Sequence, residues 1–314
     1  MKPDLPELAV VEIPAHARSR FDGDRFSYMA AGDPDAPVVL LLHGSGASAP
    51  YWRHQFTALS SQFRMVAWNA PGYALSDPLS NPTPSYEDYA EALAAFCDAL
   101  KIRRASLVGN SFGAGLALTY ARQQPDRVHR LALSGVSAGA RGRSQDAQAQ
   151  NTARRGRYFE RDSGAFTYAR AVLDLVCGAN TSEYVRREIM DVLVTTGARG
   201  YGQVRHASAQ ADPLAFAATV QAQTLIYHGT DDRVNPLQAG AIALAAALPN
   251  AQLLRLEGCG HLPEVEAAYE VNLLLHSVLR EGLDNLRPLG TEAESGFVGK
   301  GGISVIDRED RSDR

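Results

Sequence analysis

The feature that most constrains the fold is a recurring pair of elements. A short apolar run ends at Gly, Asn or Ser and is followed by a segment with helical periodicity. Continuous apolar runs are typical of parallel strands covered on both faces, and their alternation with helices favours a doubly wound α/β sheet with right-handed crossovers. The predicted strands are residues 38–42, 65–68, 106–108, 128–133, 224–227 and 252–256, and the predicted helices are 86–100, 112–124, 237–248 and 267–280.

Two regions depart from this rhythm. The stretches "VVEIP" and "RFSYMA" predict an antiparallel hairpin at one edge of the sheet. From residue 138, helical patterns at 166–176 and 182–193 follow one another without a strand, as expected of a helical lid over the carboxyl edge. We therefore divide the chain into a first core part (1–137), a helical lid (138–215), a second core part (216–287) and a polar, Gly-rich tail (288–314) that we expect to be disordered.

Composition excludes several function classes. A formal net charge of −4 offers no basic surface for nucleic acid, and no apolar run is long enough to span a membrane. The N-terminus lacks the basic and apolar regions of a secretory signal. Three scattered cysteines without a CxxC pair favour neither a disulfide framework nor zinc, so we expect a cytoplasmic protein. Assembly into a homo-oligomer is left open.

The segment "GNSFG", residues 109–113, lies between a predicted strand and a predicted helix and matches the G-x-S-x-G nucleophile elbow. An abrupt strand-to-helix turn strains the backbone of Ser111, and the flanking glycines allow the chain to close around it. The turn would direct the Ser111 hydroxyl above the sheet, at the positive end of the following helix. Ser111 is therefore the candidate nucleophile.

A serine nucleophile requires a base and an acid that orients the base, and for this elbow the chain order is Ser, acid, His. Among eight histidines, His261 follows a strand in the Gly-rich loop "EGCGHLPEVE" and is the candidate base. The loop "YHGTDDRVNP" offers Asp231 and Asp232 as candidate acids, and the pattern does not separate them. Backbone N–H groups of Phe112 and of Ser45 or Gly46 are candidate oxyanion donors. These groups need neither a metal nor an organic cofactor, so we expect none.

With these motifs in order, residues 20–285 resemble the α/β-hydrolase family. In that family the acid is the fourth residue of G-x-x-D-x-x-x-P, and Gly229, Asp232 and Pro236 match this pattern. The resemblance therefore assigns the acid to Asp232 rather than Asp231.

Within the superfamily, "GNSFGA" and "CGH" most resemble the meta-cleavage product hydrolases. These enzymes cleave a carbon–carbon bond of small acidic diketones formed by aromatic ring opening. The resemblance implies that Asn110, beside the nucleophile, and a lid arginine, Arg186 or Arg187, hold the substrate. Leu262 stands where family members carry Trp, and carboxylesterases and lactonases share the remaining motifs. A cofactor-free haloperoxidase and a non-catalytic ligand receptor are further alternatives.

Overall fold

The computed structural model describes residues 3–137, 139, 164–283, 286 and 303–306. All six predicted core strands are confirmed, and most extend beyond the predicted bounds. The described strands are β1 (Leu8–Glu12), β2 (Arg25–Ala31), β3 (Val38–Leu42), β4 (Arg64–Trp68), β5 (Ala105–Asn110), β6 (Val128–Ser134), β7 (Gln223–Gly229), β8 (Ala251–Leu256) and β9 (Ile303–Ile306).

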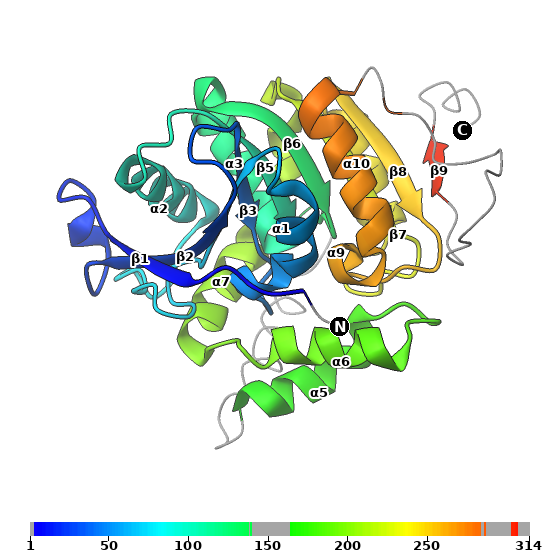
Figure 1. The fold of residues 1–314 in the computed structure, drawn as a ribbon, viewed down its shortest axis with the longest axis horizontal. Helices are drawn as coiled ribbons and strands as arrows, with labels where there is room; N and C mark the ends of the chain where they lie inside the picture. The colour runs from blue at the N-terminus through cyan, green and yellow to red at the C-terminus, as the bar shows by residue number, and fades with distance from the viewer. Residues whose placement is uncertain (1–2, 138, 140–163, 284–285, 287–302, 307–314) are drawn as a thin grey trace.

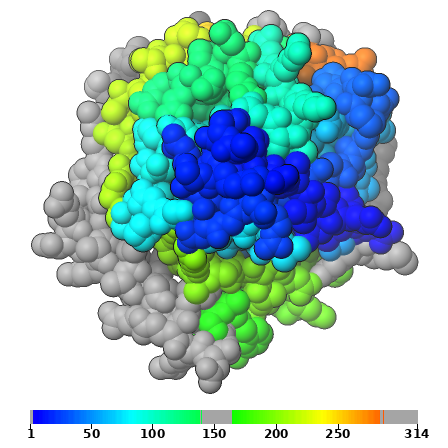
Figure 2. All heavy atoms as spheres, turned by 90° about the vertical axis from the view of Figure 1, so that its left-hand side faces the viewer, coloured from blue at the N-terminus to red at the C-terminus, as the bar shows by residue number. Residues whose placement is uncertain are grey.

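The strands form one sheet in the order β1-β2-β4-β3-β5-β6-β7-β8-β9. The pairs from β4 to β8 are parallel, as predicted for the doubly wound fold. The pairs β1–β2, β2–β4 and β8–β9 are antiparallel. The predicted N-terminal hairpin is present as β1 and β2, which cover one side of the molecule (dark blue in Figure 2).

Helices cover both faces of the sheet (Figure 1). Leu40 and Leu42 of β3 pack in one core cluster with α2 and α3, while Val39 and Leu41 pack in another with α1 and α10. This alternation follows from the two-residue period of a strand. The described helices of the core are α1 (Arg53–Leu59), α2 (Tyr86–Ala99), α3 (Phe112–Gln123), a π-helix (Gln238–Ile242), α8 (Ala243–Ala247), α9 (Pro263–Glu266) and α10 (Ala268–Glu281).

Among the described residues between β6 and β7 are the α-helices α5 (Gly164–Val176), α6 (Glu183–Leu193) and α7 (Ala198–Gln210). The arrowheads of β6 and β8 point towards the side of the molecule where α5 and α6 lie (Figure 1). Residues 138 and 140–163 of the predicted lid lie outside the described residues. Among the residues that are described, no helix combines the length and apolar character needed to cross a membrane.

The predicted disordered tail differs from the structure at one place. Residues Ile303–Ile306 form β9, which pairs antiparallel with β8 at the edge of the sheet. The run "ISVI" is β-branched at three of its four positions, and an edge strand offers unpaired backbone groups to such a segment. Residues 288–302 and 307–314 of the tail lie outside the described residues.

Candidate active site

Ser111 lies at the corner between β5 and α3. Its backbone has φ 54° and ψ −111°, a conformation that non-glycine residues rarely adopt. A Cβ added to Gly109 would lie 2.5 Å from the carbonyl oxygen of Gly113, and one added to Gly113 would lie 1.9 Å from that of Leu42. The two glycines therefore let α3 approach β5 and β3 closely enough to hold the strained corner.

Gly113→Ala should lower the free energy of unfolding by about 1–3 kcal/mol, because the backbone of Leu42 cannot move aside without disturbing the sheet. Gly202→Ala in α7 is the matched control, since an added Cβ there meets no atom within 4 Å. Urea unfolding of both variants measures the difference. Equal midpoints for the two would contradict the close packing at the corner.

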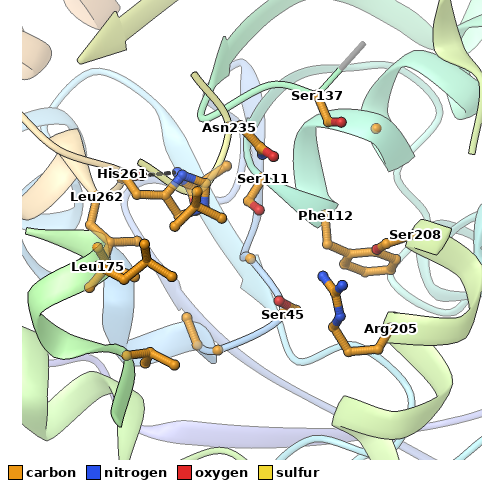
Figure 3. Close-up of a pocket in the computed structure, with 18 of the residues that line it drawn as sticks. Ser45, Ser111, Phe112, Ser137, Leu175, Arg205, Ser208, Asn235, His261 and Leu262 are labelled. Carbon is orange, nitrogen blue, oxygen red and sulfur yellow. Dashed lines mark hydrogen bonds between the residues drawn. The ribbon is translucent and has the colours of Figure 1, made fainter. Parts of the chain in front are cut away.

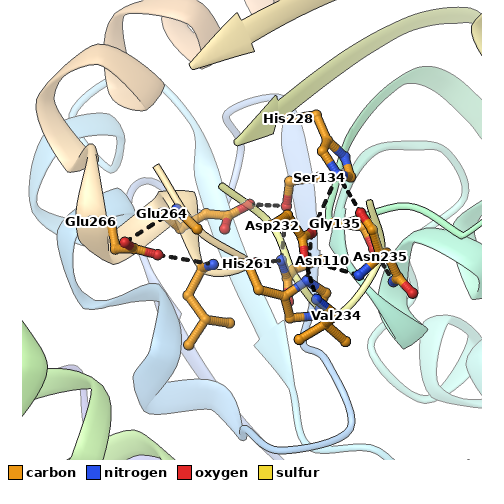
Figure 4. A network of polar contacts seen from close by, with 12 residues as sticks. Asn110, Ser134, Gly135, His228, Asp232, Val234, Asn235, His261, Glu264 and Glu266 are labelled. Atoms are coloured by element: carbon orange, nitrogen blue, oxygen red, sulfur yellow. Dashed lines mark hydrogen bonds and ion pairs between the residues drawn. The ribbon is translucent and has the colours of Figure 1, made fainter. Parts of the chain in front are cut away.

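His261 and Asp232 are brought together by the loops after β8 and β7. The Nδ1 atom of His261 lies 2.7 Å from Oδ2 of Asp232, and both side chains are buried. The other carboxylate oxygen, Oδ1, accepts hydrogen bonds from the backbone N–H groups of Val234 (2.8 Å) and Asn235 (2.9 Å). These bonds fix the carboxylate so that one oxygen faces the imidazole (Figure 4).

The charge state of Asp232 follows from its partners. Burial would by itself raise its pKa, but the charge of His261 and the hydrogen bonds from His228 and His261 outweigh burial and lower the pKa below its ordinary value. An ionised carboxylate only accepts hydrogen bonds, so Nδ1 of His261 must carry the proton. This leaves Nε2 as the basic nitrogen.

Asp231 has a different environment. Its Oδ2 accepts a hydrogen bond of 3.0 Å from the backbone N–H of Ala179, in the loop between α5 and α6. The two adjacent carboxylates thus diverge, one towards the imidazole and the other towards the loop between α5 and α6.

The segment from the end of α5 to the start of α6 is hydrogen-bonded to the chain around His261. The backbone N–H of His261 donates to the carbonyl oxygen of Val176, the last residue of α5, at 2.7 Å. The half-buried carboxylate of Glu266 accepts hydrogen bonds from the N–H of Gly178 (2.7 Å) and from the hydroxyl of Thr181 (2.6 Å). The end of α5 therefore forms part of the frame that holds His261.

Ser111 and His261 both line a cavity of about 470 Å³. In Figure 3, Ser111 lies between Leu175 and Leu262 on one side and Arg205 and Ser208 on the other. The apolar part of the lining also includes Val172 and Val176 of α5 and Leu193 of α6. The cavity thus has a cationic end at Arg205 and a largely apolar end, with the serine between them. Arg233 also lines the cavity, and its guanidinium donates to the carbonyl of Cys177 after α5.

The three candidate oxyanion residues, Phe112, Ser45 and Gly46, line this cavity. Phe112 is the first residue of α3, where backbone N–H groups have no partner within the helix. The turn after β3 is held by a hydrogen bond from the hydroxyl of Tyr73 to the carbonyl of Ser45 (2.8 Å). The buried side chain of His43 also stabilises this turn: its Nδ1 is hydrogen-bonded to the carbonyl oxygen of Gly44, and its Nε2 accepts a hydrogen bond from the N–H of Ala70. Burial lowers the pKa of His43 to about 4.

The placement of the predicted substrate-binding residues is mixed. Asn110 is fully buried and lines the cavity. Arg186 forms an ion pair with Asp174, and Arg187 is exposed and lies 3.6 Å from Glu183. Neither arginine is among the residues that line the cavity with Ser111, so the prediction that one of them reaches the substrate is not supported. Arg205 of α7, which the sequence analysis did not select, lines the cavity instead.

Comparison with known proteins places this arrangement in a family. Residues 37–268 match the family of the alpha/beta hydrolase fold. The chain belongs to this family. It is 32% identical over 259 residues to 2-hydroxymuconate semialdehyde hydrolase of Pseudomonas putida, covering 77% of this chain and 87% of the relative. It is 27% identical over 275 residues (81% and 91%) to a 2-hydroxy-6-oxononadienedioate/2-hydroxy-6-oxononatrienedioate hydrolase of Cupriavidus pinatubonensis. The enol-lactonase of Burkholderia xenovorans LB400 superposes with a TM-score of 0.73 at 26% identity, covering 83% and 98%.

The chain is therefore a hydrolase, and its cavity contains polar residues that the sequence analysis missed. Tyr86 of α2 and Arg205 and Ser208 of α7 line the cationic end. Burial raises the pKa of Tyr86 to about 12, opposed by a hydrogen bond with Ser208 and by the charge of Arg205. A signal was present in the sequence: Tyr201, Arg205 and Ser208 recur at helical spacing, which puts a guanidinium on the inner face of the helix.

The described part of the hydrolase contains no cluster of three or more His, Cys, Asp or Glu side chains suited to a metal ion. Cys97, Cys177 and Cys259 are buried free thiols.

Proposed function

We propose that this hydrolase cleaves a carbon–carbon bond of a small acidic ring-fission product, a vinylogous 1,5-diketone that binds as its dienol and carries a terminal carboxylate. Ser111 is the nucleophile, His261 the base and Asp232 the acid that orients it. The observation that carries the proposal is the shared cavity, in which the strained Ser111 and the Asp232-bound His261 lie between an apolar end and Arg205. The activities for which these relatives are named supply the substrate class.

The proposed reaction begins with ketonisation of the bound dienol, in which the hydroxyl gives up its proton and the carbon next to the keto group gains one, so that cleavage leaves a conjugated dienolate. The Ser111 proton then passes to Nε2 of His261 as Oγ attacks the keto carbon. The N–H groups of Phe112 and of Ser45 or Gly46 then stabilise the alkoxide, each contributing roughly two to three decades in rate. Cleavage of the adjacent carbon–carbon bond leaves an acyl group on Ser111, and the carbon leaving group takes the proton from His261. Water then hydrolyses the acyl enzyme and restores the serine. Asp232 stabilises the imidazolium during both steps.

Arg205 is proposed to bind the substrate carboxylate, because Figure 3 shows its guanidinium directed into the cavity beside Phe112 and Ser208. A guanidinium binds a carboxylate through two parallel hydrogen bonds. The other half of the substrate, the acyl group left on Ser111, would then occupy the apolar end formed with Leu175 and Leu262.

Arg205→Leu should raise KM for a ring-fission dienoate by roughly ten- to a hundredfold, the value of a charge-assisted hydrogen bond, and should change KM for a neutral aryl ester far less. The matched control replaces both Arg186 and Arg187 by Leu, since these side chains lie outside the cavity. Steady-state kinetics with both substrates measure the effect. If replacing Arg186 and Arg187 raised KM for the dienoate more than Arg205→Leu did, the carboxylate would be bound by the arginines of α6 instead.

A second candidate function is hydrolysis of small esters or lactones, favoured by the superposition with the enol-lactonase and by Leu262 in place of Trp. A direct comparison of kcat/KM for a ring-fission dienoate and for short aryl esters decides between the two. Preference for the dienoate supports carbon–carbon cleavage, whereas turnover of the esters alone would replace it with the esterase function.

A further inference from the structure

The cavity is backed by a buried carboxylate that the proposed reaction does not use. Glu264, in α9, is fully buried and accepts hydrogen bonds from the hydroxyls of Tyr51, Tyr227 (2.6 Å) and Ser134 (2.5 Å). A buried carboxylate is costly, and three hydroxyl donors directed at one such group form a fully satisfied network around it. Only one of these donors, Ser134, continues towards the nucleophile.

Ser134 connects Glu264 to the residue beside Ser111. The Nδ2 atom of Asn110 donates to the hydroxyl oxygen of Ser134 (3.0 Å) and to the backbone carbonyl of His261 (3.0 Å). Because the Ser134 oxygen accepts from Asn110, its own proton is directed at Glu264. The hydrogen bonds therefore run in one direction, from the amide through the hydroxyl to the carboxylate (Figure 4).

The network also determines which end of the Asn110 amide is left without a hydrogen-bond partner. With both Nδ2 hydrogen bonds formed, Oδ1 is buried and has no hydrogen-bond partner among the described residues. It lies beside Gly44, where an added Cβ would be 2.7 Å away, and both residues line the cavity. A buried acceptor without a donor is costly, and a ligand that supplies the donor removes that cost.

We propose that Glu264 is a positioning residue that acts through Ser134 to present Oδ1 of Asn110 to a hydroxyl donor of the substrate. This inference rests on the proposed function, whose dienol substrate carries such a hydroxyl, named in the relatives as the 2-hydroxy group. Glu264→Gln would place an amide donor against Ser134, so that the Ser134 hydroxyl could donate to Asn110 and the Asn110 amide could turn over.

The test is a double-mutant cycle on kcat/KM for the dienoate. Glu264→Gln and Ser134→Ala should each lower it by roughly tenfold or more, as expected for a misplaced substrate contact. In an Asn110→Ala background the further loss from Glu264→Gln should shrink to about twofold, because the contact is already gone. Tyr227→Phe, which removes a different donor to Glu264, is the matched control and should have a small effect.

Two results would contradict the positioning role of Glu264 and leave it a purely structural residue. One is a loss from Glu264→Gln that is as large in the Asn110→Ala background as in the wild type, and the other is a loss from Tyr227→Phe equal to that from Glu264→Gln. If Glu264→Gln fails to fold, Ser134→Ala still tests the same hydrogen-bond path. It keeps the Glu264 carboxylate and also the backbone carbonyl of residue 134, which accepts the N–H of Ser111 (2.9 Å). Thermal unfolding of each variant accompanies the kinetics.

Failure of the proposed function gives a different result, a wild-type enzyme that hydrolyses aryl esters but not the dienoate. In that case the effect of Glu264 on Asn110 is measured directly, from the side-chain amide signals of Asn110 in a ¹⁵N-edited NMR spectrum. Two slowly exchanging amide protons in the wild type that change shift and exchange rate in Glu264→Gln support the positioning role. Signals that are identical in both proteins overturn it.

Discussion

Ser111→Ala should lower kcat by roughly four or more decades on every substrate the enzyme accepts, because the variant has no group that can form the acyl intermediate. The residual rate would come from the oxyanion donors and the binding surface alone. Single-turnover kinetics with a dienoate and with an aryl ester measure the loss, and circular dichroism checks that the fold is intact.

Ser137→Ala is the matched control for Ser111, because Ser137 also lines the cavity but does not lie at the elbow. Its kcat should stay within about tenfold of the wild type, as expected for a side chain that makes no covalent bond in the reaction. If Ser111→Ala retained wild-type turnover, the nucleophile would have to be sought elsewhere.

Asp232→Asn should lower kcat by about four decades while leaving KM nearly unchanged. The asparagine amide can donate to Nδ1 of His261, which favours the tautomer whose proton is on Nε2 and removes the base that faces the serine. Asp231→Asn keeps the neighbouring position and changes only the contact with the N–H of Ala179, so its kcat should fall by no more than about fivefold.

Steady-state kinetics across pH separate the two aspartate variants further. The pH profiles of the wild type and Asp231→Asn should have the same shape, and Asp232→Asn should remain low throughout. A reversed order of the two losses would assign the orienting acid to Asp231.

The parts of this molecule that sequence could predict are those determined locally. The elbow needs small residues at Gly109 and Gly113 because the backbones of β5 and α3 nearly touch. Both glycines lie within one five-residue motif, so the sequence alone reveals the elbow. The strands are buried on both faces, so their apolar runs are continuous and easily recognised. The choice between Asp231 and Asp232 is not determined locally, because the loop offers both and only the family pattern G-x-x-D-x-x-x-P favours Asp232.

The cationic end of the cavity could not be predicted in the same way. Arg186 and Arg187 lie on α6, whose Ile189, Val192 and Leu193 form its buried side, and the two arginines instead pair with surface carboxylates. The helix that does supply an arginine, α7, is positioned by contacts distant in sequence. The side chain of Gln203 donates to the carbonyls of residues 79 and 81, and an added Cβ on Gly200 would lie 2.5 Å from the carbonyl of Gly72.

The bond between the amide of His261 and the carbonyl of Val176 has a consequence for how the base is positioned. Lifting the end of α5 away from the sheet would break a 2.7 Å hydrogen bond at the very residue that carries the base. The position of the imidazole therefore depends on the position of the last turn of α5, and any displacement of that turn would also displace the backbone of His261.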